Sequence, residues 1–161
     1  RFAGRVNTRY STQAVIAELV QGADLVIGSV LIPGAAAPKL VSKEMISTMM
    51  PGSVIVDVAI DQGGCFATSR PTTHAEPTFL HGDVVHYCVA NMPGAVPRTS
   101  SLALNQATLP FVKRLAAGPK AALMSDPHLR AGLAMKSGYL TSEHVAEAHS
   151  LDWRPAETVL N

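Results

Sequence analysis

Ser53-Val-Ile-Val-Asp-Val-Ala-Ile60 is the strongest strand pattern in the chain, and Asp61-Gln-Gly-Gly64 closes it. Two similar apolar runs flank it, Ala23–Val30 on one side and Val84–Val89 on the other. A short helix pattern, Ser42–Met50, separates the first run from the central one. Buried strands that alternate with helices are typical of βαβ units. The sequence therefore predicts an α/β fold with a parallel sheet.

The ends of these three strands carry the first functional argument. Leu31, Asp61 and Asn91 each follow a strand pattern, and they are spaced 30 residues apart. A parallel pair of strands needs a crossover connection of about this length. In open parallel sheets, ligands bind beyond the carboxyl ends of the strands. We therefore expect the three loops to line one crevice, where Pro33-Gly34 and Gly63-Gly64 allow a ligand close to the backbone.

Other elements are predicted from capping residues and apolar spacing. In the first half we expect a poor strand over Phe2–Asn7 and a helix from about Thr12 to Gln21, with Ser11 as its N-cap and Gly22 as its terminator. In the second half we expect a helix over Arg98–Ala117 with a kink at Pro110. Two further helices are expected, one from Asp126-Pro127 to Met135 and one from Thr141 or Ser142 to His149. The tail over 152–160 is expected to be extended. No strand is expected after Val89, so residues 98–161 are predicted to form a separate structural unit.

Composition limits the function classes. The chain has 161 residues, of which 47% are hydrophobic and 16% charged, and 13 Lys and Arg against 12 acids give a net charge of +1. This favours a packed domain and excludes disorder, and it gives no support to nucleic-acid binding by bulk charge. The apolar runs are too short to span a bilayer. Cys65 and Cys88 form no C-x-x-C pair, which favours a reducing, cytoplasmic location.

The chain lacks the Gly-x-Gly-x-x-Gly turn that holds dinucleotide phosphates. If the crevice binds a dinucleotide, its phosphate half is expected to lie upstream of Arg1. The chain also begins inside an ordered pattern and without Met. We therefore expect it to be a piece of a longer protein.

Several segments, in order along the chain, resemble the alanine dehydrogenase/pyridine nucleotide transhydrogenase family, and in particular the bacterial L-alanine dehydrogenases. These segments are Ala23-Asp-Leu-Val-Ile-Gly-Ser-Val-Leu-Ile-Pro-Gly34, Val56-Asp-Val-Ala-Ile-Asp-Gln-Gly-Gly-Cys65, Ser69-Arg-Pro-Thr-Thr73, Cys88-Val-Ala-Asn-Met-Pro93 and Val96-Pro-Arg-Thr-Ser100. The resemblance implies the C-terminal portion of an enzyme about twice as long. Residues 1–97 would supply later strands of a Rossmann-type NAD-binding domain, and residues 98–161 the helical return into the substrate domain.

The resemblance also implies an activity. Members of the family oxidise L-alanine with NAD to pyruvate, ammonium and NADH, and they form homohexamers. The implied cofactor is NAD, the implied substrates are L-alanine and pyruvate, and neither a nucleic acid nor a membrane is an expected partner. Because the Arg, Lys and His that grip the substrate in the family would lie upstream, this chain alone is expected to be inactive.

Asp61 matches the family's active-site aspartate, whose carboxylate exchanges protons near the nicotinamide. From its position alone, Asp61 also fits an ordinary turn residue before two glycines. Asp57 lies inside the strand pattern and is expected to be a structural buried acid.

The family's cofactor-binding positions map onto residues that have simpler alternative roles. Asn91 also fits a turn, Ser11 an N-cap, Arg70 an exposed surface residue, and the apolar positions core packing. The implied cofactor-binding residues are Ser11, Val30, Leu31, Val58, Ala59, Ile60, Asp61, Arg70, Val89, Ala90, Asn91 and Met92. No metal site is expected, because His74, His81 and His86 are not spaced to share one face and no acid or Cys completes a set.

Two other functions stay open. One is the NAD(H)-binding module of a proton-translocating nicotinamide nucleotide transhydrogenase, although Asp61 and Asn91 favour the dehydrogenase. The other is an inactive remnant or interaction piece, because a sheet without its first strands would expose apolar edges and faces. Poor solubility is expected unless a partner covers them.

Overall fold

The computed structural model describes residues 4–32 and 35–161. The chain divides into two compact units, one of Arg1–Ile32 with Ala36–Met92 and the other of Pro33–Ala35 with Pro93–Asn161. Within the described residues, no helix is both long enough and apolar enough to cross a membrane.

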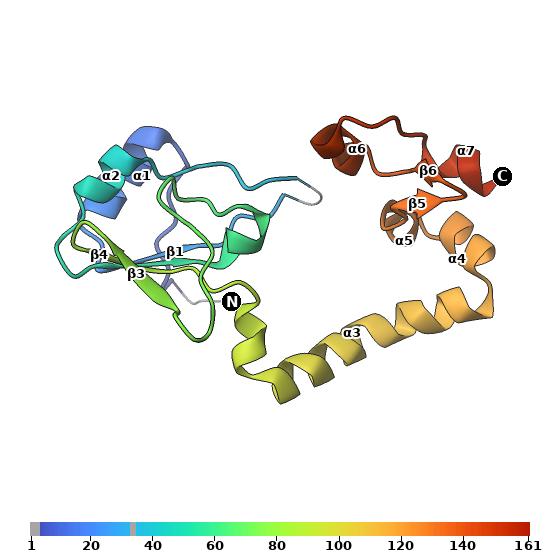
Figure 1. Ribbon diagram of the computed structural model, residues 1–161, viewed down its shortest axis with the longest axis horizontal. Helices are drawn as coiled ribbons and strands as arrows, with labels where there is room; N and C mark the ends of the chain where they lie inside the picture. The colour runs from blue at the N-terminus through green and yellow to red at the C-terminus, as the bar shows by residue number, and fades with distance from the viewer. Residues whose placement is uncertain (1–3, 33–34) are drawn as a thin grey trace. The chain divides into compact units, whose positions relative to one another are not determined.

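The first unit is built on a four-stranded sheet with the strand order β1-β2-β4-β3. Its strands are β1 (Leu25–Gly28), β2 (Val54–Asp57), β3 (Thr78–His81) and β4 (Val84–Tyr87). β1, β2 and β4 pair in parallel, whereas β3 and β4 form an antiparallel hairpin. The predicted α/β class and the parallel pairing of the three strands are therefore confirmed (Figure 1).

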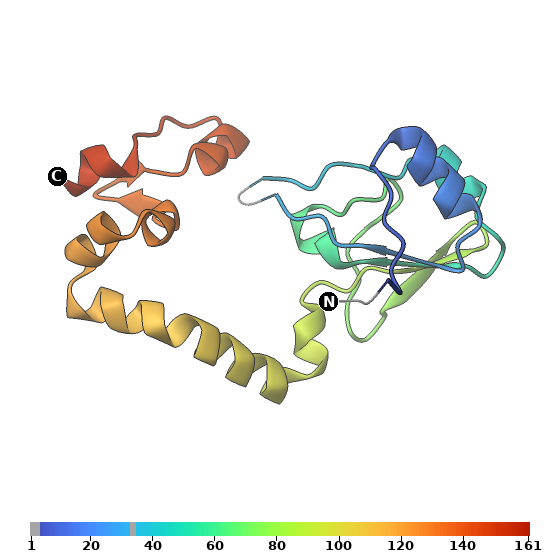
Figure 2. The ribbon, with the colours of Figure 1, turned by 180° about the vertical axis from the view of Figure 1, so that it is seen from behind.

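Two helices cover one face of this sheet, α1 (Gln13–Gln21) and α2 (Lys43–Ser47) (Figures 1 and 2). Each begins at a side-chain cap: the hydroxyl of Thr12 accepts from Val15 N–H, and that of Ser42 from Met45 N–H, both at 3.3 Å. The apolar side chains between helices and sheet form one core cluster that includes Val20, Ile46, Met49, Ile55, Phe66 and Val84.

The opposite face of the sheet and one of its edges stay uncovered among the described residues. Leu25, Ile27 and Leu80 are 53%, 60% and 68% exposed. Side chains alternate between the faces of a strand, so these residues share a face opposite to buried Ile55. β1 pairs with β2 on one side only, which leaves its other edge without a described partner. The expected fully buried first strand was therefore wrong: β1 is shorter, and one of its faces is open.

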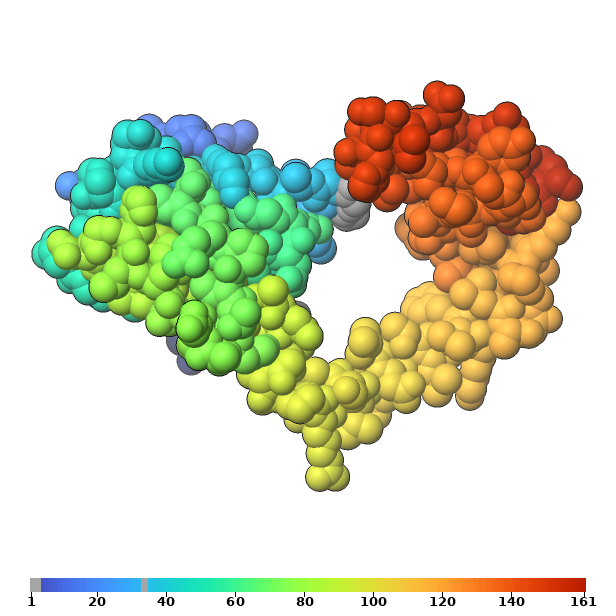
Figure 3. Space-filling model, viewed as in Figure 1, coloured from blue at the N-terminus to red at the C-terminus, as the bar shows by residue number. Residues whose placement is uncertain are grey.

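The second unit is helical with one small hairpin. Its elements are α3 (Pro97–Ala117), α4 (Pro119–Ser125), α5 (Pro127–Ala131), β5 (Met135–Lys136), β6 (Tyr139–Leu140), α6 (Glu143–His149) and α7 (Ala156–Leu160), and the 3-10 turn η2 (Met92–Ala95) precedes them. Its buried apolar residues are Ala122, Leu123, Ala146 and Leu160, and α4 contacts α7. α3 has no buried residue, and Figure 3 draws its side chains in yellow on the surface.

Several predicted boundaries need correction. β2 ends at Asp57 instead of Ile60, because the Asp57 side chain accepts from Ala59 N–H and starts a 3-10 turn. Residues 4–7 form no strand, and residues 2–3 of that prediction lie outside the described residues. The hairpin strand β3 and the pair β5–β6 were missed, α5 ends at Ala131 before Met135, and the tail is helical over Ala156–Leu160. These elements are only two to five residues long, too short for periodicity to reveal.

Candidate functional site

The carboxyl ends of β1, β2 and β4 meet at one edge of the sheet. Asn91 N–H, beyond β4, donates to the Asp61 carboxylate at 3.4 Å, and the Gln62 side-chain amide donates to Ile32 C=O, beyond β1, also at 3.4 Å. Each bond joins residues 30 apart in sequence. The structure thus brings together the three strand ends that the spacing predicted.

Asp61 is held on a tight turn. The 3-10 helix η1 (Val58–Gln62) is capped by Asp57 at its start and by Gly63 at its end. Gly63 has a φ of +89°, the left-handed conformation that favours glycine. The Lys39 ammonium donates to the carbonyls of Gly63 and Gly64, to the latter at 2.8 Å, and so ties this turn to the preceding loop. The Asp61 side chain is exposed, so its carboxylate is free to meet a ligand.

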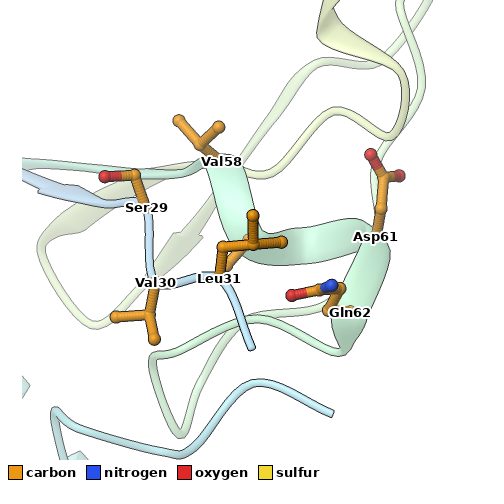
Figure 4. Close-up of a pocket in the computed structure, with 7 residues that line it drawn as sticks. Ser29, Val30, Leu31, Val58, Asp61 and Gln62 are labelled. Carbon is orange, nitrogen blue, oxygen red and sulfur yellow. The ribbon is translucent and has the colours of Figure 1, made fainter. Parts of the chain in front are cut away.

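A cavity of about 330 Å³ lies beside this turn. Its lining residues come from the end of β1 and from η1: Ser29, Val30, Leu31, Val58, Ala59, Asp61 and Gln62. Figure 4 shows the Gln62 side chain directed toward Leu31, with the Asp61 carboxylate pointing away from that pair. The Oε1 atom of Gln62 is buried without a hydrogen-bond partner in the described part of the chain. The cavity therefore combines an apolar wall with a carboxylate and an amide.

Asn91 adopts a conformation that few side chains tolerate. Its φ is +55°, in the left-handed region where Asn is one of the accepted residues. Its N–H donates to Asp61, and its carbonyl pairs with His74 Nε2 at 3.0 Å. The backbone of Asn91 is thus fixed on both sides, and its side chain is exposed beside Asp61.

A second cavity of about 390 Å³ shares Ser29 and Val30 with the first. It runs along α1 and contains Ser11, Ile16, Leu40 and Phe66 among its lining residues. Ser11 was expected to be the N-cap of α1, but that role belongs to Thr12. The Ser11 hydroxyl is therefore free of the capping role and lines this cavity.

The other predicted cofactor residues differ in how they can act. Ile60 and Val89 are buried, with 4% and 0% of each whole residue exposed, so in this structure they offer a ligand almost no surface. Ala90 is exposed and Met92 half-buried. The Arg70 guanidinium lies 4.0 Å from the Phe79 ring centroid, and Arg70 is not among the residues that line either cavity.

The structure adds residues that sequence reasoning missed at the site. Ser29 and Gln62 line the first cavity, and His74 and Lys39 hold the backbone of the two loops. Gln62 carried a usable signal, since it follows Asp61 directly. His74 and Lys39 carried none, because their partners are backbone carbonyls distant in sequence.

The cysteines and histidines were candidates for nucleophiles or metal ligands. Burial raises the pKa of the Cys65 thiol to about 11 and also raises that of Cys88, so both remain neutral thiols and weak nucleophiles. Among the residues that the structure describes, no three His, Cys, Asp or Glu side chains gather closely enough to hold a metal ion.

Known proteins resemble this chain along nearly its whole length. Residues 1–143 match the family described as alanine dehydrogenase/PNT, C-terminal domain. Alanine dehydrogenase from Halomonas elongata is 58% identical over 161 residues, which cover 99% of this chain and 43% of that protein. Alanine dehydrogenase from Mycolicibacterium smegmatis is 55% identical over 160 residues, again 99% of this chain and 43% of the relative. This chain therefore spans less than half the length of these relatives.

Two solved structures are similar. An L-alanine dehydrogenase superposes with a TM-score of 0.77 at 48% identity and covers 92% of this chain and 41% of its own. A transhydrogenase from Sinorhizobium meliloti reaches a TM-score of 0.60 at 31% identity, over 71% of this chain and 33% of its own. The predicted resemblance is confirmed, and the dehydrogenase is the more similar of the two.

Proposed function

This chain belongs to the alanine dehydrogenase/PNT family, and from that premise we propose that it forms the NAD-binding wall of an L-alanine dehydrogenase. The reaction converts L-alanine, NAD⁺ and water to pyruvate, ammonium, NADH and a proton. The observation that carries the proposal is the meeting of Asp61 and Asn91 beside an apolar cavity at the carboxyl ends of parallel strands. Residues 1–97 would then belong to the NAD-binding domain and residues 98–161 to the substrate domain.

The residues present fit part of a dinucleotide. A cavity of about 330 Å³ is near the lower end for ligand sites and is too small for a whole dinucleotide. Its wall of Val30, Leu31 and Val58 suits a flat ring, and the unpartnered Oε1 of Gln62 offers an acceptor to a hydroxyl or amide group. Ser11 in the adjoining cavity offers a hydroxyl for the adenosine side. This chain contains no glycine-rich turn. We therefore infer that its cavities bind the ring and adenosine parts of the dinucleotide, and that other residues bind the phosphates.

The chemistry divides between cofactor and protein. Bound NAD supplies an acceptor for the hydrogen on the α-carbon of alanine. Asp61 accepts a proton from the substrate amine or from the water that adds to the imine, and it returns one in the reverse direction. The Asn91 N–H keeps the carboxylate of Asp61 oriented. The Asn91 side-chain amide, which is exposed next to it, orients the substrate or the cofactor amide.

The test is a chimera in which this chain replaces the matching segment of the Halomonas elongata enzyme. It should form NADH from L-alanine and NAD, followed by absorbance at 340 nm. Asp61→Asn should lower kcat by about 10²- to 10⁴-fold, the usual contribution of a general acid–base residue. Binding of NADH to the Asn variant is the matched control, since it reports an intact cavity.

A folded chimera that binds NADH but never oxidises alanine would refute the dehydrogenase proposal. It would favour the alternative cofactor-binding module of a transhydrogenase, in line with the likeness to the Sinorhizobium meliloti protein. A chimera whose Asp61→Asn variant keeps full activity would remove Asp61 from the reaction while leaving the family assignment in place.

A further inference from the structure

Asp57 is a fully buried carboxylate at the end of β2. Its Oδ1 accepts from Ala59 N–H at 3.1 Å, and its Oδ2 accepts from Cys65 N–H at 3.0 Å and from the Ser69 hydroxyl at 2.5 Å. Ala59 lies at the start of η1, and Cys65 and Ser69 lie on the segment that follows η1. One carboxylate thus holds both ends of the loop that carries Asp61.

Ser69 extends this link to the neighbouring strand. The Cys88 thiol, directly after β4, donates to the Ser69 hydroxyl at 3.7 Å. Asn91 follows three residues later. The sequence of contacts Asp57–Ser69–Cys88 therefore joins the ends of β2 and β4, the two strands that lead to Asp61 and Asn91.

The link is packed without free space. Gly64 has a φ of +75°, and a Cβ atom there would lie 2.4 Å from Asp57 Oδ2 and 3.0 Å from Ser69 Cβ. Close packing of this kind transmits small displacements, because no void absorbs them. Neither Asp57 nor Ser69 lines either cavity beside the turn, so direct contact with a ligand does not explain this network.

We propose that Asp57 and Ser69 are positioning residues that fix the separation between Asp61 and Asn91. The catalytic consequence rests on the proposed function, whereas the structural coupling does not. A hydrogen bond that orients a reacting group from behind typically changes activity by about 10- to 100-fold, as it does around metal ligands. We expect Ser69 to act at this scale through the Asp61–Asn91 contact.

The first test needs no ligand and uses the 161-residue chain. In ¹⁵N-labelled protein, Ser69→Ala should shift the amide signals of Asp61 and Asn91 and speed hydrogen exchange at Asn91. The matched control is Ser53→Ala. Ser53 is a buried serine, whereas Ser69 is half-buried, and Ser53 lies at the opposite end of β2, where it donates to Met50 C=O at 2.6 Å. That control should leave both signals in place.

The second test is kinetic and uses the chimera. Ser69→Ala should lower kcat by about 10- to 100-fold and leave KM for NAD and alanine within about threefold. If Ser69→Ala does not fold, Cys88→Ala removes the other end of the link and should move the same two amide signals.

The outcomes separate the two proposals. Unmoved Asp61 and Asn91 signals in the folded Ser69→Ala or Cys88→Ala chain would overturn the positioning role, whatever the protein's activity. A wild-type chimera without alanine oxidation would overturn the proposed function, while the amide signals would still decide the coupling. A folded Ser69→Ala chimera that keeps the wild-type kcat would also count against a role for the hydroxyl.

Discussion

At the scale of single residues, two adjacent glycines make different demands on the chain. Gly63 and Gly64 both have positive φ, +89° and +75°, but a Cβ atom on Gly63 would meet nothing within 4 Å. On Gly64 it would strike the buried Asp57 carboxylate at 2.4 Å. Alanine substitutions at the two positions therefore separate the cost of a left-handed backbone from the cost of a steric clash.

Gly63→Ala should lower the free energy of unfolding by about 1–2 kcal/mol, the usual penalty for a left-handed non-glycine residue. Gly64→Ala should carry the same backbone penalty and lower the free energy of unfolding by about a further 1–3 kcal/mol, because its Cβ would overpack the site. The free energy of unfolding of each variant is measured by urea titration, with the amide NMR signals of β2 as the probe. Equal losses in the two variants would show that the space around Asp57 is not restrictive.

At the scale of elements, the β3–β4 hairpin contains a buried histidine with a fixed set of partners. His86 Nδ1 donates to Val84 C=O at 3.1 Å, so Nε2 is free to accept from the Thr68 hydroxyl at 2.7 Å. The ring stacks on Phe79 with 4.9 Å between centroids. Burial, assisted by nearby His81, lowers the pKa of His86 below its usual 6.5, against smaller opposing effects of the Val84 carbonyl and Asp57.

This lowered pKa predicts a loss of stability in mild acid. The unfolded chain binds a proton at His86 near pH 6.5, whereas the folded chain resists it. The contribution of His86 is therefore complete above pH 6.5 and decreases as the pH falls below it. Urea midpoints of the first unit, measured from pH 7.5 down to about 5, should fall, and His86→Gln should flatten that fall. His128→Gln, an exposed site on α5, is the control and should keep the wild-type slope.

The sequence was informative about elements with strong patterns and uninformative about those set by tertiary contacts. The runs around Val54–Asp57 and Pro97–Ala117 predicted the central strand and the long helix, because residue preferences act locally. The capping residues expected near Arg98 lie inside α3, which begins after Val96 without a side-chain cap. β3 was missed because three of its four residues are exposed and only Phe79 is half-buried, so it shows no alternation of apolar and polar positions. The kink expected at Pro110, which does lie inside α3, stays a prediction.

The same division holds for the candidate site. Regular 30-residue spacing predicted that the loops carrying Leu31, Asp61 and Asn91 would line one crevice, and the hydrogen bond from Asn91 N–H to the Asp61 carboxylate agrees. Bonds from His74 to Asn91 and from Lys39 to Gly64 link side chains to backbone across loops. No residue type specifies such a partner in advance, so sequence reasoning had no means of finding them. The roles of the cofactor-binding residues stay predictions.

At the scale of the whole molecule, the chain leaves much surface accessible to solvent. Its accessible area is 11085 Å², whereas two separate compact units that share its mass would expose about 9,300 Å². Part of the excess is apolar, since Leu25 and Ile27 stand exposed on the uncovered face of the sheet. A partner surface, such as the rest of a longer enzyme, is the natural cover for it.

We therefore expect the chain alone to be poorly soluble and to bind a hydrophobic dye such as anilinonaphthalene sulfonate. Ile27→Lys places a charge on the outer strand and should raise solubility and reduce dye fluorescence. Leu151→Lys is the matched control, because Leu151 is 58% exposed and belongs to the second unit, which does not contain this sheet. Equal gains from both variants would point to net charge instead of the sheet face.

The absence of buried side chains along α3 has a consequence for how this chain melts. Helicity without packing depends on propensity and length, and it changes gradually with temperature. The sheet unit, with its shared core, should unfold in one cooperative step. Thermal circular dichroism of the chain alone should then show a sloping loss of helix, from α3 among others, beneath a sharper transition. In an assembly that buries α3, the loss of the α3 helix and the unfolding of the sheet unit would occur in one transition.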